Sequence, residues 1–277
     1  MKNSDRKNLK SITETVREIV SEVASYIKNE SNNFQRQDIE TKNVNDFFSY
    51  VDKESERLLV KELSGLIPGA NFITEEKTID QGNGNGYCWI IDPLDGTSNF
   101  IHGSTPYAIS VALKKDQEII VGVIHEITRN ESFYSWKDGG AYLNGAKIQV
   151  SSVEWISDAL ISTGRPHNYL YNYSELMDLF NHFQYNTHGL RQSGSAATDL
   201  AYVACGRYDG RYESGLSPWD MAAGILIVKQ AGGNVCDFNG KEEYLKNGTL
   251  IASNQLIFNE FVSIVDKICY GKKLTVK

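Results

Sequence analysis

Two carboxylates, Asp92 and Asp95, stand at the end of the apolar run Trp89–Ile91, which predicts the end of a buried strand. Pro93 is expected to stop that strand, and Gly96 with the Thr, Ser and Asn that follow it suits a helix start. Carboxylate oxygens are ligands for hard cations, and the free N–H groups of a helix start bind oxyanions. The stretch therefore predicts a divalent metal beside a phosphate.

Further acidic residues stand at the boundaries of predicted elements, and taken singly each has a structural explanation. Several carboxylates meeting at one sheet edge would repel one another, and some would stay protonated unless cations were bound there. The joint pattern therefore favours a metal site. Taken alone, Asp52 and Asp220 could be helix N-caps, Glu75 and Glu76 a solvated surface pair, and Asp92 and Asp95 turn formers.

The composition excludes several classes of protein. A formal charge of −7 and a pI near 5.3 argue against general nucleic-acid binding, which leaves a basic footprint. No apolar run approaches the length of a membrane span, and the charged N-terminus does not resemble a secretory signal. The four cysteines are scattered without metal-type spacing, so we expect reduced thiols in a cytoplasmic protein.

Other common site types lack their motifs. The sequence contains no Walker-type phosphate loop, and the spacing of Asp92 and Asp95 does not match an EF-hand calcium loop. The five histidines show no metal-binding spacing, and no nucleophile elbow of a serine hydrolase occurs.

The elements that must position the acidic residues fall into two halves. Residues 1–150 predict a long amphipathic helix, a short strand leading into a second helix, and then mostly antiparallel strands and hairpins. Residues 151–277 predict alternating strands and helices. The pattern indicates an α/β protein, with an α+β subdomain over 1–150 that carries most metal ligands and an α/β subdomain over 151–277 that carries Asp220 and the specificity residues. The principal strands are expected at 47–51, 71–74, 107–113, 119–124, 133–136, 159–162, 186–190, 207–213 and 250–253, and the helices at 9–27, 52–65, 174–183, 194–206, 218–231 and from about 259.

Three ordered motifs look like the signatures of the inositol monophosphatase family. The segment from Gly194 to Glu213 and the Ala231-Gly232-Gly233 ending are also similar to bacterial members. The resemblance extends from Asp52 to the last helix. The three motifs are the acidic pair Glu75-Glu76, the stretch 92–100 and the stretch 218–224.

The resemblance implies a layered α/β/α/β/α sandwich, usually a homodimer, and an enzyme. The implied reaction is Mg²⁺-dependent, Li⁺-sensitive hydrolysis of a phosphate monoester by direct attack of water. The expected substrate is a small phosphorylated polyol, inositol 1-phosphate first, and two to three Mg²⁺ ions per site are expected.

The resemblance also implies a ligand set for the metals. Glu75, Asp92 and the backbone carbonyl of Leu94 would hold one ion. Asp92, Asp95 and Asp220 would hold a second, and Glu75 would share a third, more weakly bound ion. The first ion would lower the pKa of its bound water, and the second would stabilise the leaving alkoxide.

Catalytic and substrate residues carry over in the same way. The catalytic residues would be Glu75, Thr97 and Asp52. Thr97, paired with Asp52, would help orient and deprotonate the attacking water. Backbone N–H groups of Gly96, Thr97 and Ser98 would receive the phosphate.

The second half would contact the organic part of the substrate. Gly194, Ser195 and Ala196 resemble the family's polyol-contacting backbone, and Glu213 resembles its hydroxyl-binding carboxylate. Alternatively, Glu213 is an ordinary surface residue of a strand. Weaker candidates, which could also be structural, are Thr163, Arg165 and Arg191.

Some residues depart from the family pattern and leave the preferred alcohol open. Thr74 replaces a common Gly, Ser217 stands where some animal members carry His, and the Tyr- and Asn-rich region 165–173 is unlike typical relatives. The rival substrates are fructose 1,6-bisphosphate, histidinol phosphate and 3′-phosphoadenosine 5′-phosphate. The alternative from another class is a regulatory binding protein.

Overall fold

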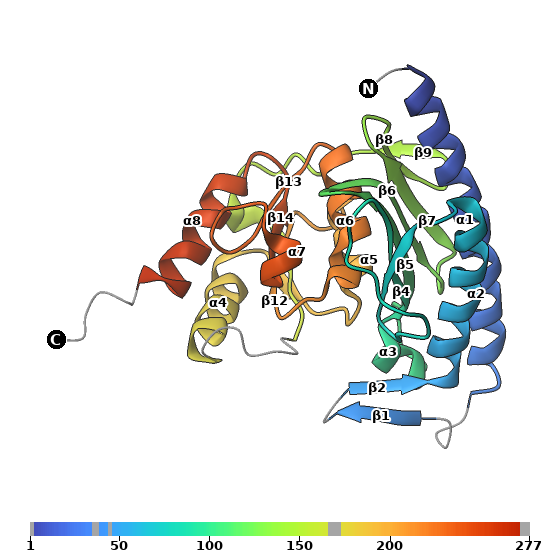
Figure 1. Cartoon of the computed structure of the whole chain (residues 1–277). Helices are drawn as coiled ribbons and strands as arrows, with labels where there is room; N and C mark the ends of the chain where they lie inside the picture. The colour runs from blue at the N-terminus through green and yellow to red at the C-terminus, as the bar shows by residue number, and fades with distance from the viewer. Residues whose placement is uncertain (1–2, 35–38, 44–45, 166–172, 272–277) are drawn as a thin grey trace.

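A computed structural model describes residues 3–34, 39–43, 46–165 and 173–271. The departures noted from the sequence between 166 and 172 therefore lie outside the described residues. Figure 1 shows five layers running from the helix pair α1 and α2 on the right to α4 and α8 on the left. Two β-sheets form the second and fourth layers, and α5 and α6 lie between them. The α/β sandwich expected from the sequence is confirmed.

The first sheet has seven strands in the order β3-β4-β5-β6-β7-β8-β9. Only β3 and β4 are parallel; every later pair is antiparallel, as the hairpin signals indicate. At the last hairpin, Asn144 and Gly145 both adopt positive φ, which matches the predicted two-residue turn. The strands are β3 (Asn71–Thr74), β4 (Tyr87–Asp95), β5 (Ala108–Lys115), β6 (Glu118–Glu126), β7 (Glu131–Trp136), β8 (Gly140–Leu143) and β9 (Ala146–Ile148).

The second sheet has five strands in the order β11-β10-β12-β14-β13. Strands β11, β10 and β12 are parallel, whereas β14 runs antiparallel to both β12 and β13. All its strands come from residues after 159, and the first sheet comes from residues 71–148. The division at residue 150 into two subdomains stays a prediction. The strands are β10 (Leu160–Ser162), β11 (Gly189–Arg191), β12 (Gly210–Ser214), β13 (Asn234–Cys236) and β14 (Thr249–Ser253).

The helices cover the sheets in three layers, each with its own apolar cluster. Helices α1 and α2 pack on the outer face of the first sheet, and the amphipathic pattern of α1 supplies the buried face through Val16, Val20 and Ile27. Helices α5 and α6 fill the space between the sheets, and α4 and α8 cover the far face of the second sheet. The principal helices are α1 (Asn3–Ser31), α2 (Tyr50–Leu66), α3 (Thr97–Ile101), α4 (Tyr173–Asn186), α5 (Ala196–Ala204), α6 (Pro218–Gln230) and α8 (Phe258–Cys269).

Several elements differ from the sequence-based expectation. Strand β4 does not stop at Pro93 but continues to Asp95 through an irregularity in its pairing with β5. Proline is tolerated at such a bulge because no ladder hydrogen bond is required there. The third strand of the second half, β12, begins at Gly210 and not at Arg207. The pattern missed the short elements β1 (Ile39–Asn43), β13, a 3-10 turn at Ile156–Asp158 and α7 (Tyr244–Asn247), because short segments carry little periodicity. Strand β1 pairs with β2 (Asp46–Ser49).

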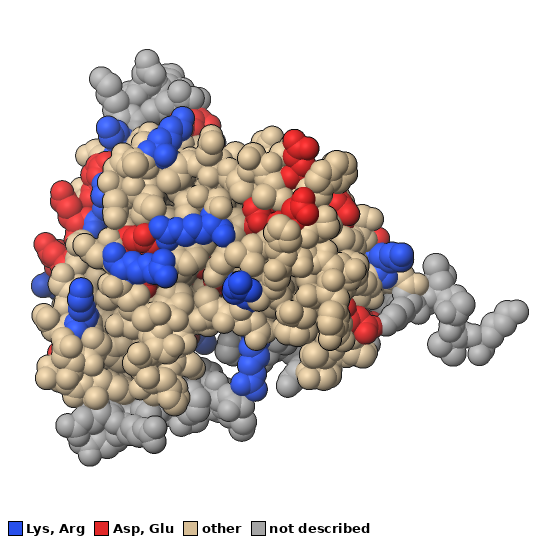
Figure 2. Space-filling model, turned by 180° about the vertical axis from the view of Figure 1, so that it is seen from behind, with Lys and Arg blue, Asp and Glu red and all other residues tan. Residues whose placement is uncertain are grey.

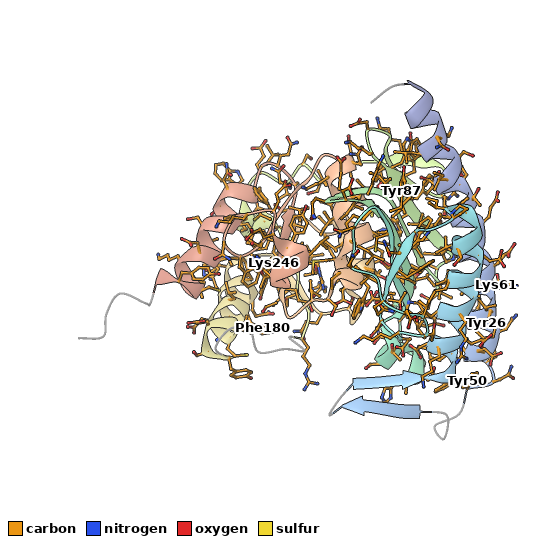
Figure 3. All side chains as sticks on the ribbon, viewed as in Figure 1. Tyr26, Tyr50, Lys61, Tyr87, Phe180 and Lys246 are labelled. Atoms are coloured by element: carbon orange, nitrogen blue, oxygen red, sulfur yellow. The ribbon has the colours of Figure 1, made fainter. Side chains whose placement is uncertain are left out.

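The side chains fill the space between the layers. In Figure 3, the labelled Tyr26 lies on α1 and Phe180 on α4, at opposite ends of the stack. All four cysteines are free thiols, and three of them, all but Cys205, are buried. No described helix is long and apolar enough to cross a membrane. On the face shown in Figure 2, acidic and basic side chains are interspersed.

Candidate active site

Four carboxylates, those of Asp92, Glu75, Asp95 and Asp220, lie close enough for their charges to shift one another's pKa values. Asp92 ends the regular part of β4 and is buried. Burial raises its pKa well above the ordinary value, and the charges of Glu75, Asp95 and Asp220 raise it further. The pKa of Asp220 is likewise raised well above its ordinary value, first by burial and then by Glu75 and Asp95. The tertiary structure therefore brings these residues together at the end of β4.

The donor set of this carboxylate cluster fits a hard divalent cation. All its side-chain donors are oxygens, and their mutual repulsion is the kind that a bound cation relieves. Among the described residues, no three Asp, Glu, His or Cys side chains are already arranged to hold one ion. Protein donors already hold one oxygen of three of these carboxylates, Oδ1 of Asp92 and Oδ2 of Asp95 and of Asp220. A carboxylate has two acceptor oxygens, so such a hydrogen bond does not prevent it from binding a cation.

Asp52 and Asp220 are not the N-caps that their positions suggested. The N-caps are Ser49 for α2 and Ser217 for α6, three residues earlier in each case. Each aspartate accepts a hydrogen bond of 2.7 Å from the backbone N–H of its serine, which is half of a capping box. The carboxylates are thereby fixed against the first turns of their helices.

Asp95 is held by residues that follow it by about a hundred positions. Its Oδ2 accepts hydrogen bonds from Ser195 Oγ at 2.6 Å and from the backbone N–H of Ala197 at 2.7 Å. Ser195 is also the N-cap of α5, where its side chain accepts from the backbone of Thr198. Burial raises the pKa of Asp95, and these two hydrogen bonds act against that rise. The side chain of Ser195 thus faces a predicted metal ligand.

Thr97 lies in contact with Asp52. Its Oγ1 is 3.1 Å from Asp52 Oδ1 and 3.0 Å from the carbonyl oxygen of Leu94, two acceptors for one hydroxyl hydrogen. The other oxygen of Asp52 accepts from the hydroxyl and the N–H of Ser49. Burial raises the pKa of Asp52, and the hydrogen bonds from Ser49 and Thr97 oppose the rise.

Two glycines allow the turn after β4 to meet the loop before α5. Gly96 has φ +92°, and a Cβ there would lie 3.0 Å from the carbonyl oxygen of Pro106. Gly194 has φ +87°, and a Cβ there would lie 2.9 Å from the side chain of Asn99. Asn99 joins the two segments by donating to the carbonyl of Ser193 at 2.8 Å. Ser98 and Gly194 are exposed beside this junction, and Ala196 is partly buried.

Glu75 is placed by a buried carboxylate that the sequence analysis missed. Glu56, on α2, accepts hydrogen bonds from Thr74 Oγ1, from the backbone N–H of Glu76 and from both donors of Thr78, at 2.6–3.0 Å. These contacts fix the segment on both sides of Glu75. No local pattern could identify Glu56, because its partners lie 18 to 22 residues away.

Glu213 is buried, so the alternative of a surface strand residue is wrong. It is 5% exposed and interacts with the guanidinium of Arg211. Burial raises the pKa of Glu213 to about 7, against the lowering effect of Arg211. Among the weaker candidates, Thr163 is buried, whereas Arg165 and Arg191 are exposed.

Other positioning residues were also missed, and only some had a sequence signal. Ser49 and Ser217 could have been found from the spacing Ser-x-x-Asp, which is the pattern of a capping box. Ala197 and Asn99 act over long sequence separations, through a backbone N–H and an amide; both stand in family-like stretches, but no local pattern indicates the contacts that they make.

Comparison with known proteins places the chain in a family. Residues 8–268 match the inositol monophosphatase family. The chain is 37% identical over 233 residues to the inositol-1-monophosphatase of Mesorhizobium japonicum, covering 84% of this chain and 88% of that protein. It is 39% identical over 231 residues to the Nus factor SuhB of Pseudomonas aeruginosa, covering 82% and 85%.

The chain is also similar in structure to a solved protein over most of its length. The extragenic suppressor protein suhB of Bartonella henselae superposes with a TM-score of 0.84 and 32% identity, covering 94% of this chain and 98% of that one. The agreement extends over nearly the whole of both chains, so it includes both sheets and the helices between them. The protein described here belongs to the inositol monophosphatase family.

Proposed function

We propose that this protein is a Mg²⁺-dependent phosphatase that hydrolyses inositol 1-phosphate to inositol and phosphate by direct attack of water. The main observation behind the proposal is the carboxylate cluster, in which the charges of Glu75, Asp95 and Asp220 lie near Asp92 and add to the rise in its pKa. It lies beside the turn at Gly96, where backbone N–H groups are available to an anion. Membership of the inositol monophosphatase family supports the same reaction.

The carboxylate cluster would hold two to three Mg²⁺ ions. Glu75, Asp92 and the carbonyl of Leu94 are the proposed ligands of one, and Asp92, Asp95 and Asp220 those of a second, with Glu75 shared by a third. Bound Mg²⁺ would supply an acidified water and neutralise charge on phosphate and leaving oxygens.

Thr97 and Asp52 would move the proton of the attacking water. Because Thr97 Oγ1 is within reach of Asp52, it can accept a proton from water while it donates its own hydrogen to the carboxylate. The raised pKa of Asp52 suits a group that must receive a proton. The carbonyl of Leu94 competes for the same hydroxyl hydrogen, so the transfer requires Thr97 to donate to Asp52 and not to Leu94.

The substrate would lie across the junction of the two halves. Backbone N–H groups of Gly96, Thr97 and Ser98 are proposed to bind the phosphate. The backbone of Gly194, Ser195 and Ala196 and the carboxylate of Glu213 are proposed to bind polyol hydroxyls. The contact between Asn99 and Ser193 supports this arrangement, because it brings the 193–196 segment to the start of α3.

A substrate panel tests the proposal. Phosphate release would be measured with inositol 1-phosphate, fructose 1,6-bisphosphate, histidinol phosphate and 3′-phosphoadenosine 5′-phosphate, with and without Mg²⁺ and Li⁺. We expect the highest kcat/KM for inositol 1-phosphate, an absolute need for Mg²⁺, and inhibition by Li⁺. A higher kcat/KM for another ester would contradict the proposed substrate.

Variants of the carboxylate cluster test the mechanism separately. Asp95→Asn and Asp220→Asn should each lower kcat by about a hundredfold or more, because charge stabilisation in the transition state is lost. Asp116→Asn is the matched control, since Asp116 is exposed in the turn between β5 and β6. Unchanged activity in the two cluster variants would contradict the ligand assignment.

A regulatory binding function is the second candidate, because a relative with 39% identity is named a Nus factor. A pull-down from cell extract with the Asp95→Asn variant would separate the two functions. A partner retained by this variant would support a binding role independent of catalysis.

We also propose that the chain forms a homodimer, as family members commonly do. Sedimentation equilibrium would measure the mass of the species in solution. A single 31.1 kDa species, the mass of one chain, would contradict the dimer.

A further inference from the structure

A buried arginine lies at the centre of the second sheet. Arg211 is on β12, between β10 and β14, and is 1% exposed. Successive side chains of a strand point to opposite faces, so Arg211 and Glu213 share one face and Tyr212 takes the other. Tyr212 packs against Phe183 and Phe261 in the outer apolar cluster. Arg211 and Glu213 therefore face the inner layer that contains α5.

The guanidinium of Arg211 contacts two carboxylates at once. Nη1 donates to Asp199, on α5, and Nη2 donates to Glu213. Nη1 also lies 3.4 Å from Ser162 Oγ on the neighbouring strand. All three charged side chains are buried. A planar guanidinium with several fixed donors suits two acceptors, whereas a lysine ammonium presents one point charge.

Gly164 confines Glu213 from another side. A Cβ at residue 164 would lie 1.8 Å from Oε1 of Glu213 and 2.4 Å from its Cδ. Such distances are far shorter than any non-bonded contact, so only glycine leaves room for the carboxylate. Glu213 is thus held between the guanidinium of Arg211 and the backbone of Gly164.

Arg211 also connects Glu213 to the helix that holds Asp95. Asp199, its second partner, belongs to the same helix, α5, whose first turn donates to Asp95 through Ser195 and Ala197. The position of Glu213 is therefore tied, through Arg211 and α5, to the carboxylate cluster. Burial favours the neutral form of Glu213, and the charge of Arg211 is the largest effect that opposes it.

We propose that Arg211 is a positioning residue for substrate specificity, which holds the carboxylate of Glu213 in one orientation so that it accepts a hydrogen bond from a hydroxyl of a polyol phosphate. The inference rests on the proposed function, because that function assigns Glu213 to the polyol. A phosphate ester without such a hydroxyl gains nothing from this contact. The effect of Arg211 should therefore depend on the substrate.

The test compares inositol 1-phosphate with phenyl phosphate, which lacks free hydroxyls. R211K and R211M should raise KM for inositol 1-phosphate by about tenfold, the effect of one lost hydrogen bond to a charged group, with a smaller change in kcat. KM for phenyl phosphate should change by less than about twofold, which is within the effect expected for a residue that makes no contact with the ester. G164A should show the same selective loss, because it displaces Glu213 from the other side.

A double-mutant comparison isolates the route through Glu213. In E213Q, whose own KM for inositol 1-phosphate should be raised, adding R211K should cause little further change. R207K is the matched control, because Arg207 pairs with Glu131 outside the site, and it should leave both KM values unchanged. Circular dichroism would show which variants fold; if R211M does not, R211K and G164A decide the question.

The outcomes separate this inference from the proposed function. Equal rises in KM for both esters, or an R211K effect that persists in full in E213Q, would overturn the positioning role of Arg211. An active wild type whose KM for inositol 1-phosphate is unchanged by R211K and G164A would overturn it as well. A wild type that hydrolyses phenyl phosphate but no polyol phosphate contradicts the proposed function, and with it this inference.

Discussion

Asp95 Oδ2 accepts a hydrogen bond of 2.6 Å from Ser195 Oγ, which stands one hundred residues later in the chain. Asp95 follows the bulge of β4, and Ser195 begins α5, so this contact joins the first sheet to the helix layer between the sheets. A residue assigned from sequence to the substrate thus also supports a predicted metal ligand. The two halves share the site at this point.

The first prediction concerns this contact. Ser195→Ala removes both the N-cap of α5 and a donor that favours ionised Asp95. We expect the free energy of unfolding to fall by about 1 kcal/mol, and the Mg²⁺ concentration for half-maximal activity to rise severalfold. Urea unfolding and Mg²⁺ titration of activity measure the two effects. Ser64→Ala, on an exposed face of α2, is the control, and an unchanged Mg²⁺ requirement in Ser195→Ala would contradict the coupling.

The second prediction concerns the hydroxyl of Thr97. Thr97→Ala should lower kcat by about a hundredfold with little change in KM, because proton transfer to Asp52 is interrupted. Thr97→Ser keeps the hydroxyl and should retain most of the activity. Steady-state kinetics at saturating Mg²⁺ provide the measurement. Equal losses in the alanine and serine variants would show that the methyl group, and not the hydroxyl, is what matters.

The third prediction concerns Glu56, the anchor of the segment around Glu75. Glu56→Gln replaces one acceptor oxygen by a donor, which leaves either the N–H of Glu76 or the donors of Thr74 and Thr78 without an acceptor, depending on how the amide is oriented. We expect a loss of about 2 kcal/mol in stability and a lower kcat, because Glu75 is no longer fixed. Thermal unfolding and phosphate release measure these changes. Glu62→Gln, on the exposed side of the same helix, should behave as wild type; if Glu56→Gln does too, the anchoring role is refuted.

The fourth prediction concerns His125, a buried residue on β6. Burial and the positive charge of Arg17 lower its pKa to about 4. The unfolded chain therefore binds the proton first as the pH falls below about 6.5, so the folded state loses stability between about pH 6.5 and about pH 4.

His125→Asn removes this titration, and a comparison with wild type isolates it from the carboxylates that titrate in the same range. Between about pH 7.5 and about pH 5, wild type should lose about 2 kcal/mol more than the variant. Urea unfolding at both pH values is the measurement. His188→Asn, at an exposed histidine, is the control and should follow wild type. Parallel curves for His125→Asn and wild type would refute the prediction.

Much of the fold could be predicted because its signals are local. The helical spacing of Val16, Val20 and Ile27, the turn at Asn144-Gly145 and the apolar runs at strand positions depend only on neighbouring residues. Two of the short elements, β13 and α7, were missed because three or four residues do not establish a period. Pro93 misled because the rule that it ends a strand does not hold at a bulge.

The sequence by itself determined the α/β class and the candidate carboxylates, because residue types, spacings and periodicities are properties of the chain alone. Its motifs also determined the family, and the layered sandwich followed from that resemblance. Only the tertiary structure decided what holds those carboxylates. Asp95 accepts a hydrogen bond from the first residues of α5, and Glu213 contacts Arg211 and packs against Gly164. No pattern of neighbouring residues in the sequence specifies these contacts. Such contacts arise when distant segments are packed together, and burial then sets their pKa values, because the loss of water acts only after the layers have closed.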